Sequence, residues 1–237
     1  ITKKGNLDAD SNQGLFGKVL NATIKDVNII DCNITGYQYI GGVVGYAEGD
    51  YWNNKTYYSS CNVSGCTVSG TIQNAESIQS TSIGGIVGQS DNRSHISNCV
   101  SHATVSGYEY CGGIVGIQQS RSSISNCFYT GVVTATKGYV GANVGYNGFE
   151  SSMSNNYHTS ASTGGVGEYN KTYGTDQEGA AELAVQITAD DDVTLTLPAA
   201  TYECDKKNYY KNGTVVTLDY ETIEGVEFVQ YTVNNTT

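Results

Sequence analysis

The sequence has few of the residues that build helices. Proline, methionine and tryptophan occur once each, and Ala, Leu, Glu and Lys, which favour helices, are scarce for 237 residues. By contrast, the chain has 29 Gly and 19 Tyr, and it is rich in Val, Ile, Thr, Asn and Ser. Val, Ile, Thr and Tyr fit the pleated surface of a strand, so this composition predicts an all-β protein.

Basic residues are also scarce. The 12 Lys and Arg are outnumbered by 23 Asp and Glu, which gives a formal net charge of −11. Such a chain repels phosphate backbones, so we expect no nucleic-acid partner. No apolar run approaches the roughly 20 residues that cross a bilayer, so we expect no membrane insertion in this segment. Residues 1–20 contain no signal-peptide core, and we expect a targeting segment upstream of Ile1.

Motifs for metal and cofactor chemistry are missing from the sequence. None of the seven cysteines forms a Cys-X-X-Cys pair, and only three His are present, so zinc spacing is absent. We therefore expect no metal and no cofactor. The acidic run "ADDDV" (189–193) allows a weak cation site, but exposed turn acids are the more common explanation.

A glycine-containing unit recurs along the chain. The five units are GLFG (14–17), GVVG (42–45), GIVG (85–88), GIVG (113–116) and ANVG (142–145). Their last residues lie 28, 43, 28 and 29 residues apart. A phosphate-binding loop needs a following helix and usually a lysine, whereas polar turns follow these units, so we interpret the glycines as structural.

Two further phrases follow each glycine unit, such as "ISNC" and "CTVSG". Three short strand-like phrases per repeat are typical of one coil of a solenoid. The sequence thus predicts an all-β fold, a parallel β-helix or solenoid of about 28-residue three-strand coils. The separation of 43 residues is explained by insertions in repeat two, before Cys61 and between Gly70 and Gly85.

The repeat offers an explanation for the cysteines. One position is predicted to hold Val27, Cys61, Cys99, Cys127 and Asn156, and another Cys32, Cys66, Ala103 and Gly131. Positions that accept Cys, Val, Ala and Gly need a small buried group, so we favour free thiols in the core over disulfides. Cys111 is predicted to stand where Ile40 stands two repeats earlier, and Cys204 lies outside the repeats, open to solvent exposure.

These phrases resemble the GLUG repeat, whose glycine-leucine-any-glycine pattern "GLFG" spells out, over residues 14 to about 167. GLUG repeats occur in large bacterial surface and secreted proteins, including adhesin-like proteins and the non-catalytic part of some immunoglobulin A1 metalloproteases. The resemblance implies an extracellular stalk or display module and supplies no catalytic residue. The metalloprotease motif His-Glu-X-X-His is absent from the chain, so protease activity does not carry over.

The domain organisation follows from where the repeat stops. We assign 1–170 to the solenoid, 171–184 to a linker with a short capping helix at 175–184, and 185–237 to a small β module. Strands are expected at 193–198, 213–221 and 226–234. Residues 209–234 resemble a divergent internalin-type B repeat, a module of bacterial surface proteins, although Val226 and Tyr231 replace its usual Tyr and Trp.

Candidate functional residues are few. The acids of residues 1–170 are not expected to align between neighbouring coils, and the three His occupy unmatched repeat positions. The insertion in repeat two is different, because it contains Tyr51, Trp52, Tyr57 and Tyr58. Such insertions map to surface loops, where aromatic rings stack on sugars or pack against proteins. These four residues are the candidate ligand-binding site, with a lid folded back on the coil as the alternative.

The function predicted from the sequence is a non-catalytic bacterial cell-surface or secreted repeat protein that serves in adhesion, in display or as a stalk. Its partner would be a protein or glycan of a host or neighbouring cell. Two alternatives stay open. One is a carbohydrate-binding or carbohydrate-cleaving β-solenoid, for which stacked acids beside Arg or Lys on one flat face would be the sign. The other is an accessory region of a secreted protease.

Overall fold

The structure is a computed structural model of the 237-residue chain. It describes residues 11–50, 59–75, 81–160, 163–169, 181–187 and 196–215. The chain divides into two compact units, Ile1–Glu182 and Leu183–Thr237, which are described separately.

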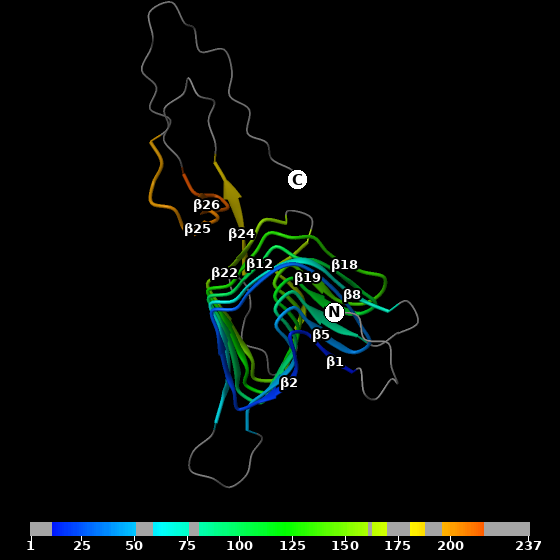
Figure 1. The fold of residues 1–237 in the computed structure, drawn as a ribbon. Coiled ribbons are helices and arrows are strands. Elements are labelled where there is room, and N and C mark those ends of the chain that lie inside the picture. Colours follow the sequence, from blue (N-terminus) through cyan, green and yellow to red (C-terminus); the bar gives the residue numbers. More distant parts are fainter. Residues whose placement is uncertain are drawn as a thin grey trace, which may run out of the picture. The chain divides into compact units, whose positions relative to one another are not determined.

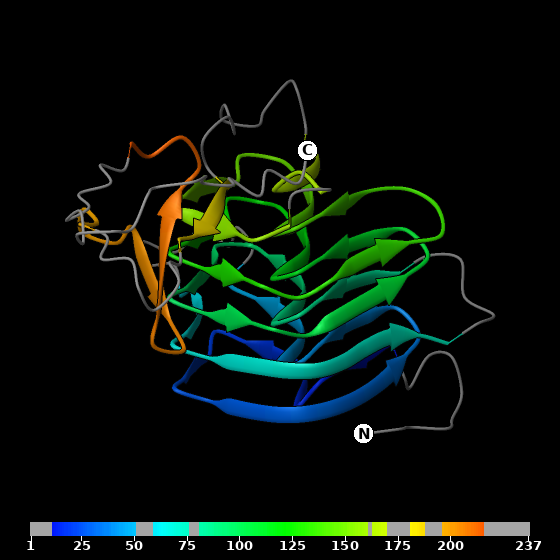
Figure 2. The same cartoon turned by 90° about the horizontal axis from the view of Figure 1, so that it is seen from above.

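The first unit is a β-solenoid made of four parallel sheets, each of which takes strands from successive turns of the chain (Figures 1 and 2). Sheet A contains β4 (Asn28–Gly36), β8 (Thr67–Asn74), β12 (Val100–Ser101), β13 (Thr104–Gly107), β17 (Phe128–Tyr129), β18 (Val133–Ala135) and β22 (Asn156–His158). Sheet B contains β1 (Asn12–Gln13), β5 (Tyr39–Gly41), β9 (Ser82–Gly84), β14 (Tyr110–Gly112) and β19 (Val140–Gly141).

The other two sheets complete each turn. Sheet C contains β2 (Phe16–Leu20), β6 (Val44–Glu48), β10 (Val87–Asp91), β15 (Val115–Gln118), β20 (Val144–Asn147) and β23 (Val166–Tyr169). Sheet D contains β3 (Thr23–Lys25), β7 (Cys61–Ser64), β11 (Ser94–Ser97), β16 (Ser123–Ser125) and β21 (Ser152–Ser154).

The chain visits the sheets in the order B, C, D, A, and each circuit is one coil. Coil 1 runs from β1 to β4, coil 2 from β5 to β8, coil 3 from β9 to β13, coil 4 from β14 to β18 and coil 5 from β19 to β22. The predicted all-β solenoid with three phrases per coil is confirmed. The segment around each glycine unit forms two short strands, one in sheet B and one in sheet C. The chain bends between them, for example at Gly42 and Val43.

The corner between sheets D and A depends on one residue per coil with a left-handed backbone. Asp26, Gly65, Asn98, Asn126 and Asn155 occupy it with φ between 52° and 62°. Gly, Asn and Asp tolerate this conformation better than other residues. The backbone ladder continues through the corner, since each of the first four donates its N–H to the carbonyl of the next coil. This requirement explains the Asn of the repeated phrase "ISNC".

The glycine units lie where sheets B and C pack backbone against backbone. A Cβ on Gly88 would lie 2.5 Å from the Gly45 carbonyl oxygen and 2.5 Å from the Ile40 nitrogen. A Cβ on Gly116 would lie 2.5 Å from the Ile83 nitrogen and 2.6 Å from the Gly88 carbonyl oxygen. No side chain fits at these distances. The repeated glycines therefore form a packing ladder rather than a phosphate-binding loop.

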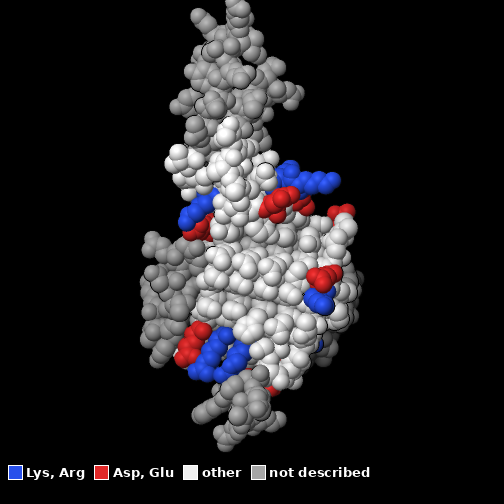
Figure 3. Space-filling model, turned by 90° about the vertical axis from the view of Figure 1, so that its left-hand side faces the viewer, with Lys and Arg blue, Asp and Glu red and all other residues white. Residues whose placement is uncertain are grey.

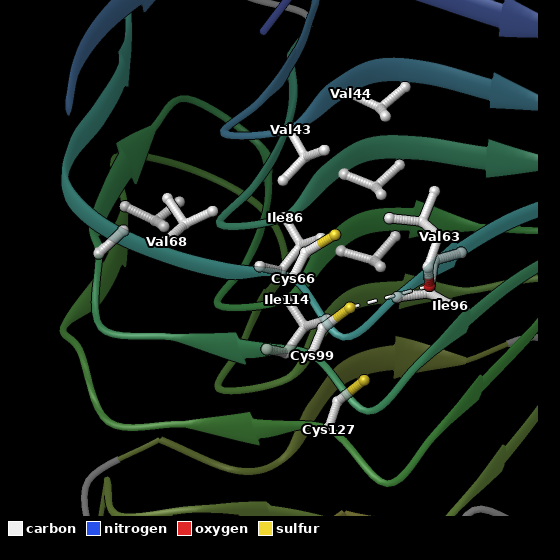
Figure 4. Close-up of a cluster of buried hydrophobic side chains, with 14 of the residues drawn as sticks. Val43, Val44, Val63, Cys66, Val68, Ile86, Ile96, Cys99, Ile114 and Cys127 are labelled. Atoms are coloured by element: carbon white, nitrogen blue, oxygen red, sulfur yellow. Dashed lines mark hydrogen bonds between the residues drawn. The ribbon is translucent and has the colours of Figure 1, made fainter. Parts of the chain in front are cut away.

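The core contains a ladder of thiols, which corrects the predicted alignment of repeat two. Cys66, Cys99 and Cys127 stack in successive coils, directly after the left-handed corner residue (Figure 4). Cys61 instead pairs with Ser94 on sheet D. Cys32 pairs with Gly70 on sheet A and not with Cys66. The shift arises because the first insertion lies almost entirely before β7. Cys66, five residues later than the predicted Cys61, therefore stands directly after the corner residue Gly65.

The other predictions about cysteine are mostly confirmed. The cysteines are free thiols, and Cys61, Cys66, Cys99, Cys111 and Cys127 are buried with 0% exposure. Ile40, Ile83 and Cys111 follow one another in register on sheet B, so Cys111 does occupy the position of Ile40. Cys204 is also buried, at 8% exposure, although it lies outside the repeats.

The second unit has antiparallel strands in its described part. Strand β26 (Lys207–Lys211) pairs with β25 (Tyr202–Cys204) and with β24 (Ala181–Gln186). A two-residue turn at Asp205 and Lys206, with φ of 51° and 62°, connects β25 to β26. Both residues have positive φ, as in the type I′ turns that suit the twist of a hairpin.

The local predictions for this region were partly wrong. The predicted capping helix at 175–184 is strand from Ala181 onward, because these residues join a sheet, and its earlier part lies outside the described residues. The described parts of two predicted strands, 196–198 and 213–215, do not form strands. At the second of these, a turn at Asn212 and Gly213 follows the end of β26. The acidic run 189–193 and the predicted strand 226–234 lie outside the described residues. In the part of the chain that the structure describes, no helix could cross a membrane.

Candidate functional site

The four predicted aromatic site residues, Tyr51, Trp52, Tyr57 and Tyr58, lie outside the described residues. The structure does show the base of their insertion. Asp50 and Ser59 are joined by two hydrogen bonds, from the Asp50 N–H to the Ser59 carbonyl (2.9 Å) and from the Ser59 N–H to Asp50 Oδ2 (3.1 Å). The insertion therefore starts and ends at one closed corner, between sheets C and D.

The outer face of sheet C carries charged, aromatic and amide side chains. Its side chains form two columns, because every second residue of a strand points outward. The first column is Lys18, Tyr46, Gln89, Ile117, Tyr146 and Glu168. The second column is Leu20, Glu48 and Asp91, which Gln119 follows beyond the end of β15.

Two carboxylates are direct register partners on this face. Glu48 of coil 2 pairs with Asp91 of coil 3, and Lys18 lies beside them, with its Nζ 2.7 Å from Glu48 Oε2. The expectation that acids do not align between neighbouring coils is therefore wrong for this pair. The error follows from treating the acids as isolated surface residues, whereas both stand three positions after the last glycine of their unit.

Both carboxylates accept hydrogen bonds within the protein. Asp91 Oδ2 accepts from the Tyr46 hydroxyl (3.1 Å) and from Gln119 Nε2 (2.9 Å), and its Oδ1 accepts from the Asn92 N–H (2.8 Å). Asn92 Nδ2 also donates to Glu48 Oε1 at 3.2 Å. Asp91 is only 8% exposed, so neighbouring donors and not water stabilise its charge. The network fixes these side chains in place.

Tyr46 is the centre of the network. Its pKa is raised well above the usual value of 10.0, first by burial and then by the negative charges of Asp91 and Glu48. The Lys18 ammonium lies 4.7 Å from the centroid of its ring, a cation–π distance. The phenol is thus held as a neutral hydrogen-bond donor, with an oriented ring.

Tyrosines of sheet B extend this surface into two aromatic patches. The coil-2 patch is the pair Tyr39 and Tyr46, whose ring centroids are 5.2 Å apart. The coil-5 patch consists of Tyr139 and Tyr146 together with Tyr110 of coil 4. The ring centroids of these three residues lie 5.3 to 6.2 Å apart. Edge-to-face and offset pairs at such distances attract each other.

Small polar residues of coil 3 separate the two patches. Ser82 occupies the register position between Tyr39 and Tyr110, and Gln89 follows Tyr46 in its column. Ser82 is 2% exposed and Gln89 is 6% exposed, whereas Tyr139 is 36% exposed. The aromatic rings on either side are therefore more accessible than the polar residues of coil 3 between them.

The outer face of sheet D differs from this surface. Its two columns are Thr23, Asn62, His95, Ser123 and Ser152, and Lys25, Ser64, Ser97, Ser125 and Ser154. Only Lys25 among them is charged, and Figure 3, which views this side of the solenoid, shows a broad area without charged residues. Of the histidines only His95 lies on this face, where its Nδ1 is 2.7 Å from Ser123 Oγ, whereas His102 contacts Thr130 beside sheet A.

The arrangement on sheet C suits binding better than proton transfer. Glu48 is in an ion pair, Asp91 accepts three hydrogen bonds, and the Tyr46 phenol is held neutral. What these groups offer together is aromatic faces beside fixed donors and acceptors.

Sequence reasoning missed this site, although one signal pointed to it. Tyr39 and Tyr110 occupy the same place in the phrases "GYQYIGG" and "GYEYCGG", and Tyr46 and Tyr146 each follow the last glycine of their unit. Alignment of the positions outside the glycine unit would have placed these tyrosines in two columns.

Comparison with known proteins supports the repeat itself. Models of protein families match the GLUG motif at residues 36–73 and 79–106, which extend from the end of β4 to β13. Neither the curated proteins nor the solved structures give a match to the chain. The matched segments lie in coils 2 and 3, with the same phrases repeated in the coils on either side, and they show that the solenoid contains GLUG repeats.

Proposed function

We propose that the chain is a non-catalytic repeat module of a bacterial cell-surface or secreted protein, which serves in adhesion, in display or as a stalk. The observation that carries the proposal is the use of the repeated residues. The glycines permit close backbone packing between sheets B and C, and the stacked cysteines fill the core. The repeated glycines and cysteines, the residues that could have formed a phosphate loop or a thiol site, are thus used for packing.

The solenoid architecture supports the same proposal. Each coil adds a strand, or a pair of short strands, to each of the sheets, so the fold extends along one direction while its outer columns vary. Such a scaffold displays side chains at a regular spacing. A cell-surface location is an inference from the GLUG family and rests on that resemblance.

Two other functions are compatible with the family. A carbohydrate-binding solenoid is favoured by one observation, the aromatic rings beside Glu48, Asp91 and Lys18 on sheet C. A carbohydrate-cleaving enzyme would need a carboxyl group free to donate a proton, whereas both carboxylates of this pair are engaged. An accessory role in a secreted protease has no specific observation in its favour.

Surface location is tested by protease treatment of intact cells of the source bacterium, followed by identification of the released peptides. We expect peptides from residues 11–169 among them, together with adhesion of beads coated with the purified chain to host or neighbouring cells. Release of these peptides only after cell lysis would contradict the proposed location, and beads that fail to adhere would leave only the display or stalk role.

A further inference from the structure

We propose that the outer face of sheet C, with the two aromatic patches, is a binding surface for an extended neutral polysaccharide. This inference rests on the proposed non-catalytic function and adds the ligand class and the site. Its residues are Tyr39 and Tyr46 of the coil-2 patch, Tyr110, Tyr139 and Tyr146 of the coil-5 patch, and the polar groups between them.

The aromatic rings supply the first part of the argument. Five tyrosines occupy outward positions at the junction of sheets B and C, where they remain partly accessible and Tyr139 is 36% exposed. A tyrosine presents an apolar ring face together with a polar hydroxyl. The C–H face of a sugar ring stacks on such a surface, and the sugar hydroxyls need hydrogen-bonding partners nearby.

The polar network supplies those partners. Glu48 and Gln119 hold a carboxylate and an amide group at fixed positions within two coils of Tyr46, and the nearly buried Asp91 accepts a hydrogen bond from Gln119. A carboxylate accepts at up to about four lone-pair sites, so Glu48, which is more exposed than Asp91, retains capacity beyond the bonds it already makes. Because the network is formed without the ligand, binding would not require the side chains to be ordered first.

Charge selects a neutral ligand over an anionic one. Lys18 is neutralised by Glu48 at 2.7 Å, and Asp91 adds negative charge to the same face. The whole chain carries a net charge of −11, which repels polyanions such as acidic glycans and nucleic acids.

The spacing of the coils selects an extended ligand. Stacked strands lie about 4.8 Å apart, so coil 2 and coil 4 are separated by roughly 10 Å along the solenoid. The two patches therefore lie in line on one face, with the less exposed Ser82 and Gln89 between them. A chain of sugar units laid along this line would stack on one patch, pass over the polar coil and reach the other.

The competing explanation is that the stacked tyrosine rings only stabilise the solenoid. The following experiment distinguishes this explanation from ligand binding. The full 237-residue chain is run in native gels that contain yeast mannan, xylan, barley β-glucan or starch, with alginate and heparin as anionic probes. The test variant is Tyr39→Ser with Tyr139→Ser, one tyrosine from each patch. Tyr39→Phe with Tyr139→Phe keeps the rings, and Tyr108→Ser removes a half-buried tyrosine outside the patches. Thermal unfolding of each variant serves as the control that it is folded.

We expect at least one neutral polysaccharide to retard the chain, with affinity reduced about tenfold or more in the double Ser variant. The double Phe variant and Tyr108→Ser should bind within about threefold of the unmodified chain. Retardation by no neutral polysaccharide, retardation by the anionic probes alone, or equal binding by the double Ser variant would each overturn the proposal. Equal weakening by Tyr108→Ser would also overturn it. Release of shorter sugars would overturn the non-catalytic function and leave the binding surface intact.

Discussion

The interior of the solenoid and the outer face of sheet C use the same repeat in opposite ways. The interior repeats its residues from coil to coil, as in the ladder Cys66, Cys99 and Cys127. The outer face changes at every coil, from Lys18 to Tyr46 to Gln89. In this comparison, repetition occurs where the fold constrains the residue, and variation occurs where the side chain is free to serve recognition.

The largest effect is expected from a side chain placed in the glycine ladder. In Gly116→Val, the added Cβ would lie 2.5 Å from the Ile83 nitrogen, so sheets B and C must separate. We expect a loss of at least about 3 kcal/mol in the free energy of unfolding, or failure to fold, as measured by denaturant titration. Gly164→Val is the matched control, since its Cβ would have no neighbour closer than 3.7 Å, and it should change little. Equal losses at both positions would contradict the role of the ladder.

A smaller effect is expected from a cavity in the core. Ile114 is fully buried, whereas Ile117, three residues later, points outward on sheet C. Ile114→Ala should lower the free energy of unfolding by about 2 to 5 kcal/mol, because the core cannot close the space. Ile117→Ala should cost less than about 1 kcal/mol in the same titration. If the outward residue cost as much as the inward one, the assignment of faces would be wrong.

Thiol reactivity separates interior from surface without any substitution. Burial raises the pKa of Cys111 to about 12 and also raises the pKa of Cys61, so little reactive thiolate forms at neutral pH. In the folded chain, the five fully buried thiols should react with a chromogenic disulfide on the order of 100-fold more slowly than in denaturant. Rapid reaction of all seven thiols in the folded chain would contradict the buried ladder.

The smallest effect is expected at high pH, from Tyr46. Its folded-state pKa is raised above the ordinary value of 10.0, first by burial and then by Asp91 and Glu48. Folding therefore favours the neutral phenol, so its contribution to stability is complete below about pH 10 and is lost as the pH rises further. The fall in thermal midpoint between pH 9 and pH 11.5 should be smaller in Tyr46→Phe. An identical fall in both proteins would show that Tyr46 titrates normally.

Much of the fold could be predicted from the sequence because the interior imposes the same demand on every coil. The left-handed corner accepts Asn98 and Asn126 but few other residue types, and the contact between sheets B and C accepts only glycine at Gly88 and Gly116. These demands repeat about every 28 residues, so they are visible without a structure.

Repeat two was harder to predict because it contains an insertion and two cysteines that fit the same pattern. Cys61 and Cys66 both follow a short polar phrase, and only backbone pairing distinguishes them. The ladder places Cys66 beside Cys99, whereas Cys61 pairs with Ser94. Spacing alone does not determine where an insertion leaves and rejoins a coil.

The candidate site was harder still, because it depends on contacts between different sheets. Tyr39 and Tyr46 meet through the bend at Gly42 and Val43, and their sequence separation does not reveal this contact. The pairing of Glu48 with Asp91 was visible as an equal offset from the preceding glycine. The residues of each column can be aligned in the sequence, but only the fold shows to which side of the sheet their side chains point.

The most direct test of the central claim compares two adjacent residues of β20. Gly145 faces sheet B, where an added Cβ would lie 2.8 Å from the Cys111 nitrogen, and Tyr146 points outward into the coil-5 patch. The measurement is the free energy of unfolding of Gly145→Ala and of Tyr146→Ser. We predict a loss of at least about 2 kcal/mol for Gly145→Ala and of less than about 1 kcal/mol for Tyr146→Ser. A larger loss for Tyr146→Ser than for Gly145→Ala would contradict the account, because the outer tyrosines and not the glycine ladder would then hold the fold together.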